Sequence, residues 1–223
     1  MCAVIGAVLQ APTANHFEML KRVFLESKIR GLHATGLAYI KNGEVHIDKR
    51  PVPADQFPFN FSSYLNEDGN LYLIGHCRYS TSDLEYNQPL GNDSHAIVHN
   101  GVITQELPEK WEELYGYKTL TKNDSELIQF SNDPLAEFSH MSMAVCELVA
   151  CTKELTVYRN GKRPLYLTTL DNGCIITSTA DVAKRANLNY ATTPVPMNTY
   201  LSFETPSVMK VQKVQINGAI DYQ

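Results

Sequence analysis

Cys2 combines a residue type and a position that suggest nucleophilic chemistry. It follows Met1 directly, and a methionine in front of so small a residue is one that aminopeptidases remove. Removal would leave a thiol and a free α-amine on the same residue. Because the reference pKa of an α-amine is roughly 7.7–8.0 and that of a thiol about 8.5, the amine can accept the thiol proton near neutral pH. Cys2 would then supply both the nucleophile and its base.

A second candidate is the segment that carries Arg78 and Thr81, which follows an apolar run at Leu71–Ile74. An arginine presents a planar fork that holds a carboxylate with two hydrogen bonds, and a threonine adds a hydroxyl donor. Polar residues at the end of a buried strand are often binding residues. The alternative is a solvated strand end with an ordinary surface arginine, and the segment alone leaves both interpretations open.

The pair Asn100-Gly101 follows another apolar run, Ala96–Val98. An asparagine amide and a glycine backbone N–H are suitable donors to an oxyanion, because glycine permits close approach. Asn-Gly pairs are also typical of hairpin turns, and the pair occurs five times in this chain. Taken alone, the pair at 100–101 is therefore better explained as a turn.

Asp124 offers a carboxylate that could pair with an ammonium group. It begins a segment, 124–130, that we predict to be helical. Its alternative role is that of a helix N-cap. The two roles are compatible.

The order and spacing of these segments resemble the glutaminase domain of class II glutamine amidotransferases, which belong to the N-terminal nucleophile hydrolases. The resemblance covers roughly residues 2–203. The motifs that carry it are Cys2, Arg30-Gly31, Thr35-Gly36, Gly75-His76-x-Arg78-Tyr79-x-Thr81, Gln88-Pro89-Leu90, His99-Asn100-Gly101, Asn123-Asp124-Ser125-Glu126 and Arg159-x-Gly161-x-Arg163-Pro164-Leu165.

The resemblance implies a glutaminase that releases glutamate and ammonia from L-glutamine through a thioester intermediate, without a metal or cofactor. It assigns Cys2 as the nucleophile and, through its amine, the general base. Asn100 and Gly101 would form the oxyanion site. Arg78 and Thr81 would bind the substrate α-carboxylate, and Asp124 its α-ammonium.

Three departures from the family pattern leave alternatives open. They are His33-Ala34 before Thr35-Gly36, Ser82-Asp83 after Thr81, and Ser178-Thr179 in place of Ser-Glu. One alternative is an amidohydrolase of the same fold that acts on a γ-glutamyl or other small amide. Another is a non-catalytic regulatory module. For a glutaminase, we expect a separate synthase subunit to accept the ammonia.

The apolar and turn patterns predict an α+β chain of antiparallel strands with a few helices. Strands are predicted at Ala3–Leu9, Leu71–Cys77 and several stretches after Met143, and a hairpin around Asn42-Gly43. The resemblance implies a four-layer αββα sandwich of two antiparallel sheets covered by helices. We expect residues 1–223 to form a single domain, because no linker-like stretch divides them.

Composition narrows the class of protein. The 223 residues carry a net charge of −5 with scattered Lys and Arg, which gives no electrostatic footprint for nucleic acid or an anionic membrane. No apolar run reaches the ~18 residues of a membrane span, and no secretory signal is evident. The five cysteines are irregularly spaced, which favours a reducing, cytoplasmic location. We expect all of them except Cys2 to be buried thiols.

Overall fold

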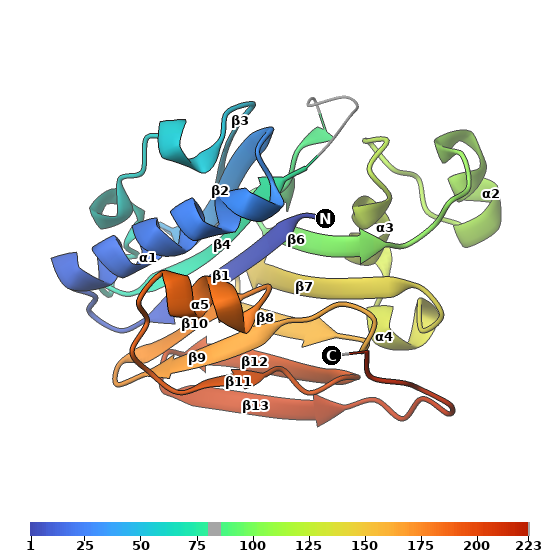
Figure 1. Cartoon of the computed structure of the whole chain (residues 1–223). Helices are drawn as coiled ribbons and strands as arrows, with labels where there is room; N and C mark the ends of the chain where they lie inside the picture. Colours follow the sequence, from blue (N-terminus) through green and yellow to red (C-terminus); the bar gives the residue numbers. More distant parts are fainter. Residues whose placement is uncertain (80–85, 223) are drawn as a thin grey trace.

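The computed structural model describes residues 1–79 and 86–222, and over these residues the strands form two antiparallel sheets (Figure 1). The seven-stranded sheet has the order β11-β9-β10-β1-β4-β2-β3. Its strands are β1 (Ala3–Leu9), β2 (Ala34–Lys41), β3 (Glu44–Arg50), β4 (Leu71–Arg78), β9 (Tyr166–Leu170), β10 (Gly173–Thr177) and β11 (Thr192–Pro194).

The six-stranded sheet has the order β13-β12-β8-β7-β6-β5 among the described residues. Its strands are β5 (Leu90–Gly91), β6 (His95–Val102), β7 (Ser142–Val149), β8 (Glu154–Arg159), β12 (Thr199–Thr205) and β13 (Val208–Lys213). The helices are α1 (Ala14–Ser27), α2 (Trp111–Tyr115), α3 (Leu127–Phe130), α4 (Pro134–Glu137) and α5 (Ala180–Arg185), with short 3-10 turns that include η5 (Pro108–Lys110) and η6 (Asp124–Glu126).

Three apolar clusters separate four layers. One lies between the seven-stranded sheet and α1 and α5, and includes Ile5 and Phe24. The second lies between the two sheets and includes Val4 and Val98. The third lies between the six-stranded sheet and α2–α4, and includes Trp111. The expected αββα sandwich of two antiparallel sheets with helical cover is therefore confirmed.

Strand periodicity explains how the layers arise from the sequence. Successive side chains of a strand point to opposite faces. In β1, Ile5 packs under the helices while Val4 and Val8 pack between the sheets. Both faces of this central strand are covered, which is why its sequence is continuously apolar.

The apolar run at Ala96–Val98 is part of a longer strand in the structure. As β6 it runs from His95 to Val102, so Asn100-Gly101 lies inside a strand and pairs with β7. The pair at 42–43 instead forms the predicted hairpin turn between β2 and β3, with φ of 53° and 73° at its two residues. Long-range pairing, which an Asn-Gly dipeptide does not specify, distinguishes the two.

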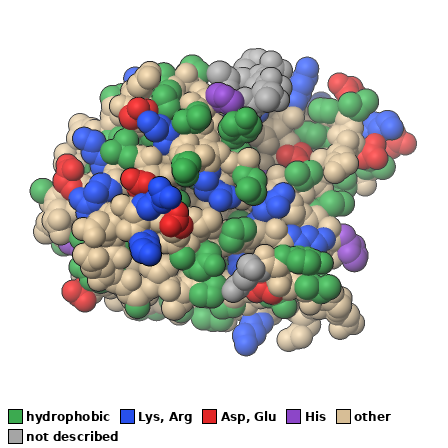
Figure 2. All heavy atoms as spheres, viewed as in Figure 1, with side chains coloured by type: hydrophobic (Ala, Val, Ile, Leu, Met, Phe, Trp, Pro, Cys, Tyr) green, Lys and Arg blue, Asp and Glu red, His purple; other side chains and the backbone are tan. Residues whose placement is uncertain are grey.

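The cysteines follow the expectation with one exception. Cys77, Cys146 and Cys174 are buried, and burial raises the pKa of the Cys77 and Cys174 thiols to about 12. Cys151 is exposed, because it lies in the turn after β7; the prediction of a buried thiol was wrong there. Of the described helices, none is long and apolar enough to cross a membrane. Figure 2 shows basic, acidic and apolar side chains interspersed on one face of the molecule.

Candidate active site

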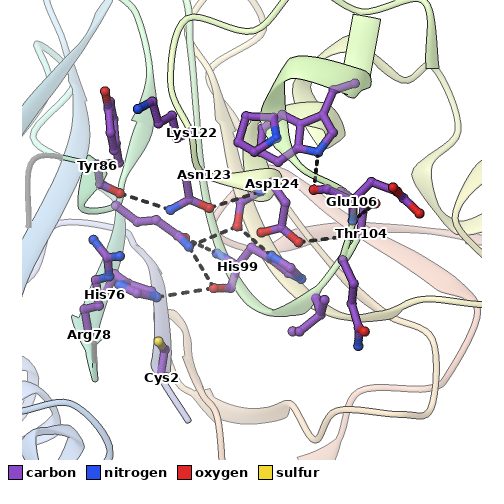
Figure 3. Close-up of a pocket in the computed structure, with 17 residues that line it drawn as sticks. Cys2, His76, Arg78, Tyr86, His99, Thr104, Glu106, Lys122, Asn123 and Asp124 are labelled. Carbon is purple, nitrogen blue, oxygen red and sulfur yellow. Dashed lines mark hydrogen bonds between the residues drawn. The ribbon is translucent and has the colours of Figure 1, made fainter. Parts of the chain in front are cut away.

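A cavity of about 510 Å³ brings together residues that lie far apart in the sequence. Its wall includes Cys2, Arg78, Gly101 and Asp124, four of the six residues predicted from the sequence (Figure 3). Asn100 is buried next to Gly101. Thr81 falls outside the described residues.

Cys2 reaches the cavity because of the register and alternation of β1. Ala3 pairs with Cys77 on β4, so the residue before it lies opposite Arg78. Alternation puts Cys2 on the same side as Val4, which faces the second sheet. The guanidinium Nε of Arg30 donates to the Cys2 carbonyl oxygen at 3.1 Å, and the Cys2 thiol lies 4.0 Å from the Tyr79 carbonyl oxygen.

Arg78 is the last residue of β4, where the strand runs out between β1 and β2. It pairs with Ala34 of β2. Its Nη1 donates to the Asn87 amide oxygen at 2.7 Å, which fixes one edge of the guanidinium against the segment before β5. The side chain lines the cavity with Cys2.

Asn100 faces the space between the sheets, because Ala96 and Val98 on the same side of β6 belong to the core between them. The residue is 3% exposed, and its amide nitrogen has no hydrogen-bond partner among the described residues. Leaving a buried donor unpaired costs about 1–3 kcal/mol. A donor kept in this state is suited to an oxygen atom that arrives with a ligand.

Gly101 directs its backbone N–H away from β7. It lies opposite Met143, whose N–H and C=O both bond to Asn160 on the β8 side. Residues paired across an antiparallel ladder without mutual hydrogen bonds point these groups outward, so the Gly101 N–H points toward the cavity side of β6. A Cβ here would lie 1.8 Å from the Ser142 carbonyl oxygen, which leaves glycine as the fitting residue.

Asp124 is held by the chain that leaves β6. Its Oδ2 accepts from the backbone N–H groups of Ile103 at 2.6 Å and Thr104 at 3.1 Å. The helix N-cap considered for this residue is Asn123, whose Oδ1 accepts from the Ser125 N–H at 3.1 Å. The Asp124 carboxylate is therefore part of the cavity wall, and the cavity carries a fixed cation and a fixed anion in Arg78 and Asp124.

Two histidines in the cavity wall are uncharged at neutral pH. Burial, assisted by the nearby Arg78 cation, lowers the pKa of His76 to about 3. Burial also lowers the pKa of His99, although the Asp124 carboxylate opposes this shift. Within the described residues, no three His, Cys, Asp or Glu side chains gather into a group that could hold a metal ion.

Sequence reasoning did not assign a role to several residues of this wall. Pro108 and Trp111 line the cavity from a segment that carries no motif pointing to a site. Lys122 also lines it and stands directly before the motif at Asn123-Asp124. Gln88, His99 and Ser125 also line it. They stand within the family-like motifs, so their positions were flagged but their roles were not.

Comparison with solved structures finds close likenesses in fold. One is titled glutamine phosphoribosylpyrophosphate (PRPP) amidotransferase from B. subtilis complexed with ADP and GMP, with a TM-score of 0.70 and 20% sequence identity over 97% of this chain and 50% of that chain. Another, titled the structure of the allosteric regulatory enzyme of purine biosynthesis, has a TM-score of 0.68 at 20% identity, with the same coverage.

This chain thus spans about half the length of those chains. Comparisons of the sequence with protein-family models and with curated proteins find no match. The structural likeness shows the fold, and it confirms the architecture that the motifs implied.

Proposed function

We propose that this protein hydrolyses L-glutamine to glutamate and ammonia, with Cys2 as the nucleophile. The observation that carries the proposal is the shared cavity, whose wall holds a thiol, a cation at Arg78 and an anion at Asp124. A free α-amino acid carries one negative and one positive group on its α-carbon. Arg78 would bind the carboxylate and Asp124 the ammonium, which would direct the side-chain amide toward Cys2.

The chemistry follows from the groups on this wall. The Cys2 sulfur attacks the amide carbon, and its proton passes to the Cys2 α-amine. The carbonyl oxygen becomes an oxyanion that accepts from the Asn100 amide and the Gly101 N–H. The C–N bond breaks as the amine returns the proton to the leaving nitrogen, which gives ammonia and a γ-glutamyl thioester. Water then attacks the thioester, and glutamate leaves with the thiol restored.

The mechanism requires that Met1 be removed. Met1 is 71% exposed, so the residue that must be removed lies at the surface. Arg30 binds the Cys2 carbonyl oxygen rather than its amine, and this contact would persist after Met1 is gone. It would hold the new N-terminus in place while the amine shuttles a proton.

One assay tests the proposal directly. Wild-type protein and Cys2→Ala are compared for glutamate release from glutamine, and the intact mass of each sample establishes whether Met1 is absent. We expect activity only in wild type that lacks Met1. Protein that lacks Met1 yet neither hydrolyses glutamine nor reacts at Cys2 with a glutamine-like electrophile would refute it, and a retained Met1 would favour the regulatory alternative.

The ammonia would be used by a separate synthase subunit. Support comes from one solved chain of similar fold whose title names an amidotransferase, an enzyme that passes an amide nitrogen to an acceptor. The expected result is co-purification of a synthase from the native source and a higher glutaminase kcat when that synthase is added back. Failure of both would leave simple hydrolysis as the function.

The apolar part of the cavity wall favours a second candidate, hydrolysis of a larger γ-glutamyl amide. Pro108 and Trp111 line the cavity together with the polar residues, and they could contact a substituent on the amide nitrogen. A panel of glutamine, γ-glutamyl anilides and amides without an α-amino acid head would separate the two candidates. Faster turnover of a substituted amide would favour the second.

A further inference from the structure

Strand β6 loses its neighbour on one side just before the predicted oxyanion residues. Its partner β5 pairs with it only through Leu90 to Ile97 and Gly91 to Ala96. Continuation of that register would bring position 88 opposite His99. The N–H and C=O of His99 point to this side, since its N–H bonds to Gln88 and not to β7.

The side chain of Gln88 takes the place of the missing strand. Its Oε1 accepts from the His99 N–H at 2.5 Å, and its Nε2 donates to the His99 carbonyl oxygen at 3.1 Å. A neighbouring strand would make the same two bonds with its backbone. The second hydrogen of Nε2 goes to the Ser125 hydroxyl, also at 3.1 Å. Gln88 is 5% exposed, so all of its amide groups are engaged away from solvent.

The His99 ring bonds to the same serine hydroxyl, Ser125, and to the backbone of β7. Its Nε2 lies 3.2 Å from the Ser142 carbonyl oxygen, which only accepts, so Nε2 carries the proton. Its Nδ1 therefore accepts from the Ser125 hydroxyl at 2.8 Å. His76 also contacts His99: its Nε2 lies 3.2 Å from the His99 carbonyl oxygen. Figure 3 draws as dashed lines those of these hydrogen bonds that join residues of the cavity wall.

These hydrogen bonds hold the backbone and ring of His99, the residue directly before Asn100 and Gly101. Alternation turns the Asn100 side chain to the opposite face of β6, toward the sheet that carries Cys2. The Gly101 N–H points to the same edge of the strand as the His99 N–H, because the two residues are two apart. A rotation or slip of β6 at His99 would therefore displace both donors together.

We propose that Gln88 is a positioning residue of the oxyanion site: it stands in for an absent strand at His99 and thereby holds the two donors that follow. The inference rests on the proposed glutaminase function and deepens it. Gln88 touches no reacting atom in this scheme. Its contribution is the orientation of Asn100 and Gly101 during formation and breakdown of the tetrahedral intermediate.

The test compares Gln88→Leu with Gln88→Glu and with the control Gln129→Leu. Leucine removes all three bonds; glutamate can still accept from the His99 N–H but cannot donate. Gln129 is also a glutamine next to β5, and its Nε2 donates to the Leu90 carbonyl oxygen at 3.2 Å. Two reactions of Cys2 are measured: glutamine hydrolysis, which passes through an oxyanion, and alkylation by iodoacetamide, which does not.

We expect Gln88→Leu to lower kcat for glutamine by about 10- to 100-fold, less than the 10²–10³ for loss of a whole donor. The KM and the iodoacetamide rate should stay within about twofold of wild type. Gln88→Glu should show the same pattern if Gln88→Leu does not fold, and Gln129→Leu should match wild type in both reactions. Undiminished kcat in a folded Gln88 variant, or equal loss of hydrolysis and alkylation, would overturn this inference and leave the proposed glutaminase function standing. A wild type that alkylates at Cys2 but hydrolyses no glutamine would overturn the proposed function and this inference with it.

Discussion

The amide nitrogen of Asn100 is a buried donor without a partner among the described residues, and leucine has nearly the same shape without polar atoms. Replacement of an unpaired buried polar group by an apolar group of the same shape is close to neutral or stabilising. For Asn100→Leu we therefore expect an unfolding free energy within about 1 kcal/mol of wild type, or higher. The same change removes one of the two proposed oxyanion donors, and loss of such a donor lowers kcat by about 10²–10³.

Asn66 provides a matched control. It is likewise buried, and its amide nitrogen is also unpaired, but its Oδ1 accepts from the backbone N–H groups of Asp68 at 3.1 Å and Asn70 at 2.9 Å. Asn66→Leu leaves those two N–H groups without an acceptor and should lower the unfolding free energy by about 2 kcal/mol or more. It lies in the turn before β4, outside the cavity, so kcat should be unchanged.

Urea unfolding and glutamate release, measured on wild type and both variants, test the pair of expectations. The expected outcome is that one variant loses activity and keeps stability while the other does the reverse. The reasoning is refuted if Asn100→Leu keeps kcat within about threefold of wild type. It is also refuted if that variant is destabilised as much as Asn66→Leu, because Asn100 would then be an ordinary structural residue.

Three further predictions follow from other contacts. Asp124→Asn should raise KM for glutamine by about 10- to 100-fold, because one charge-assisted hydrogen bond to the substrate is lost. Arg78→Gln should have the same effect. If steady-state kinetics show an unchanged KM for both variants, these residues do not bind the substrate ammonium and carboxylate. Because the pKa of His76 is lowered from 6.5 to about 3, the unfolded chain binds a proton there that the folded chain does not. The resulting stability is fully present above about pH 6.5 and is lost as the pH falls toward 3. Acid titration of unfolding should therefore show wild type losing more stability than His76→Asn, and parallel curves would contradict the assignment. Asp221→Ala should lower the unfolding free energy by about 2 kcal/mol, because it leaves the buried Arg159 guanidinium without its bidentate partner at 2.8–2.9 Å. This loss is smaller than the roughly 3–5 kcal/mol of a fully buried pair because the Asp221 side chain is 30% exposed. A melting temperature unchanged from wild type would contradict this prediction.

The sequence alone predicted the elements whose signals are local. A continuous apolar run predicted β1, and Asn42-Gly43 predicted the turn between β2 and β3; both are confirmed. These predictions succeeded because strand alternation and turn conformation depend on a few adjacent residues. The candidate residues were also identifiable by type, since a thiol, a guanidinium and a carboxylate are each suited to few tasks. Their catalytic roles stay predictions, as does the single domain over 1–223.

Only the tertiary structure decided what Asn100-Gly101 and Asp124 are. Asn-Gly has the same local preference at all five of its positions, but pairing with β7 makes residues 100–101 part of a strand. The helical turn beginning at Asp124 is capped by the side chain of its neighbour Asn123. The Asp124 carboxylate is therefore not the cap and lines the cavity instead. Gln88 is the clearest case. Its side chain bonds to His99 of β6 because β5 begins only at Leu90 and does not reach that residue. Where one strand begins beside another is a property of the folded chain that no local pattern encodes.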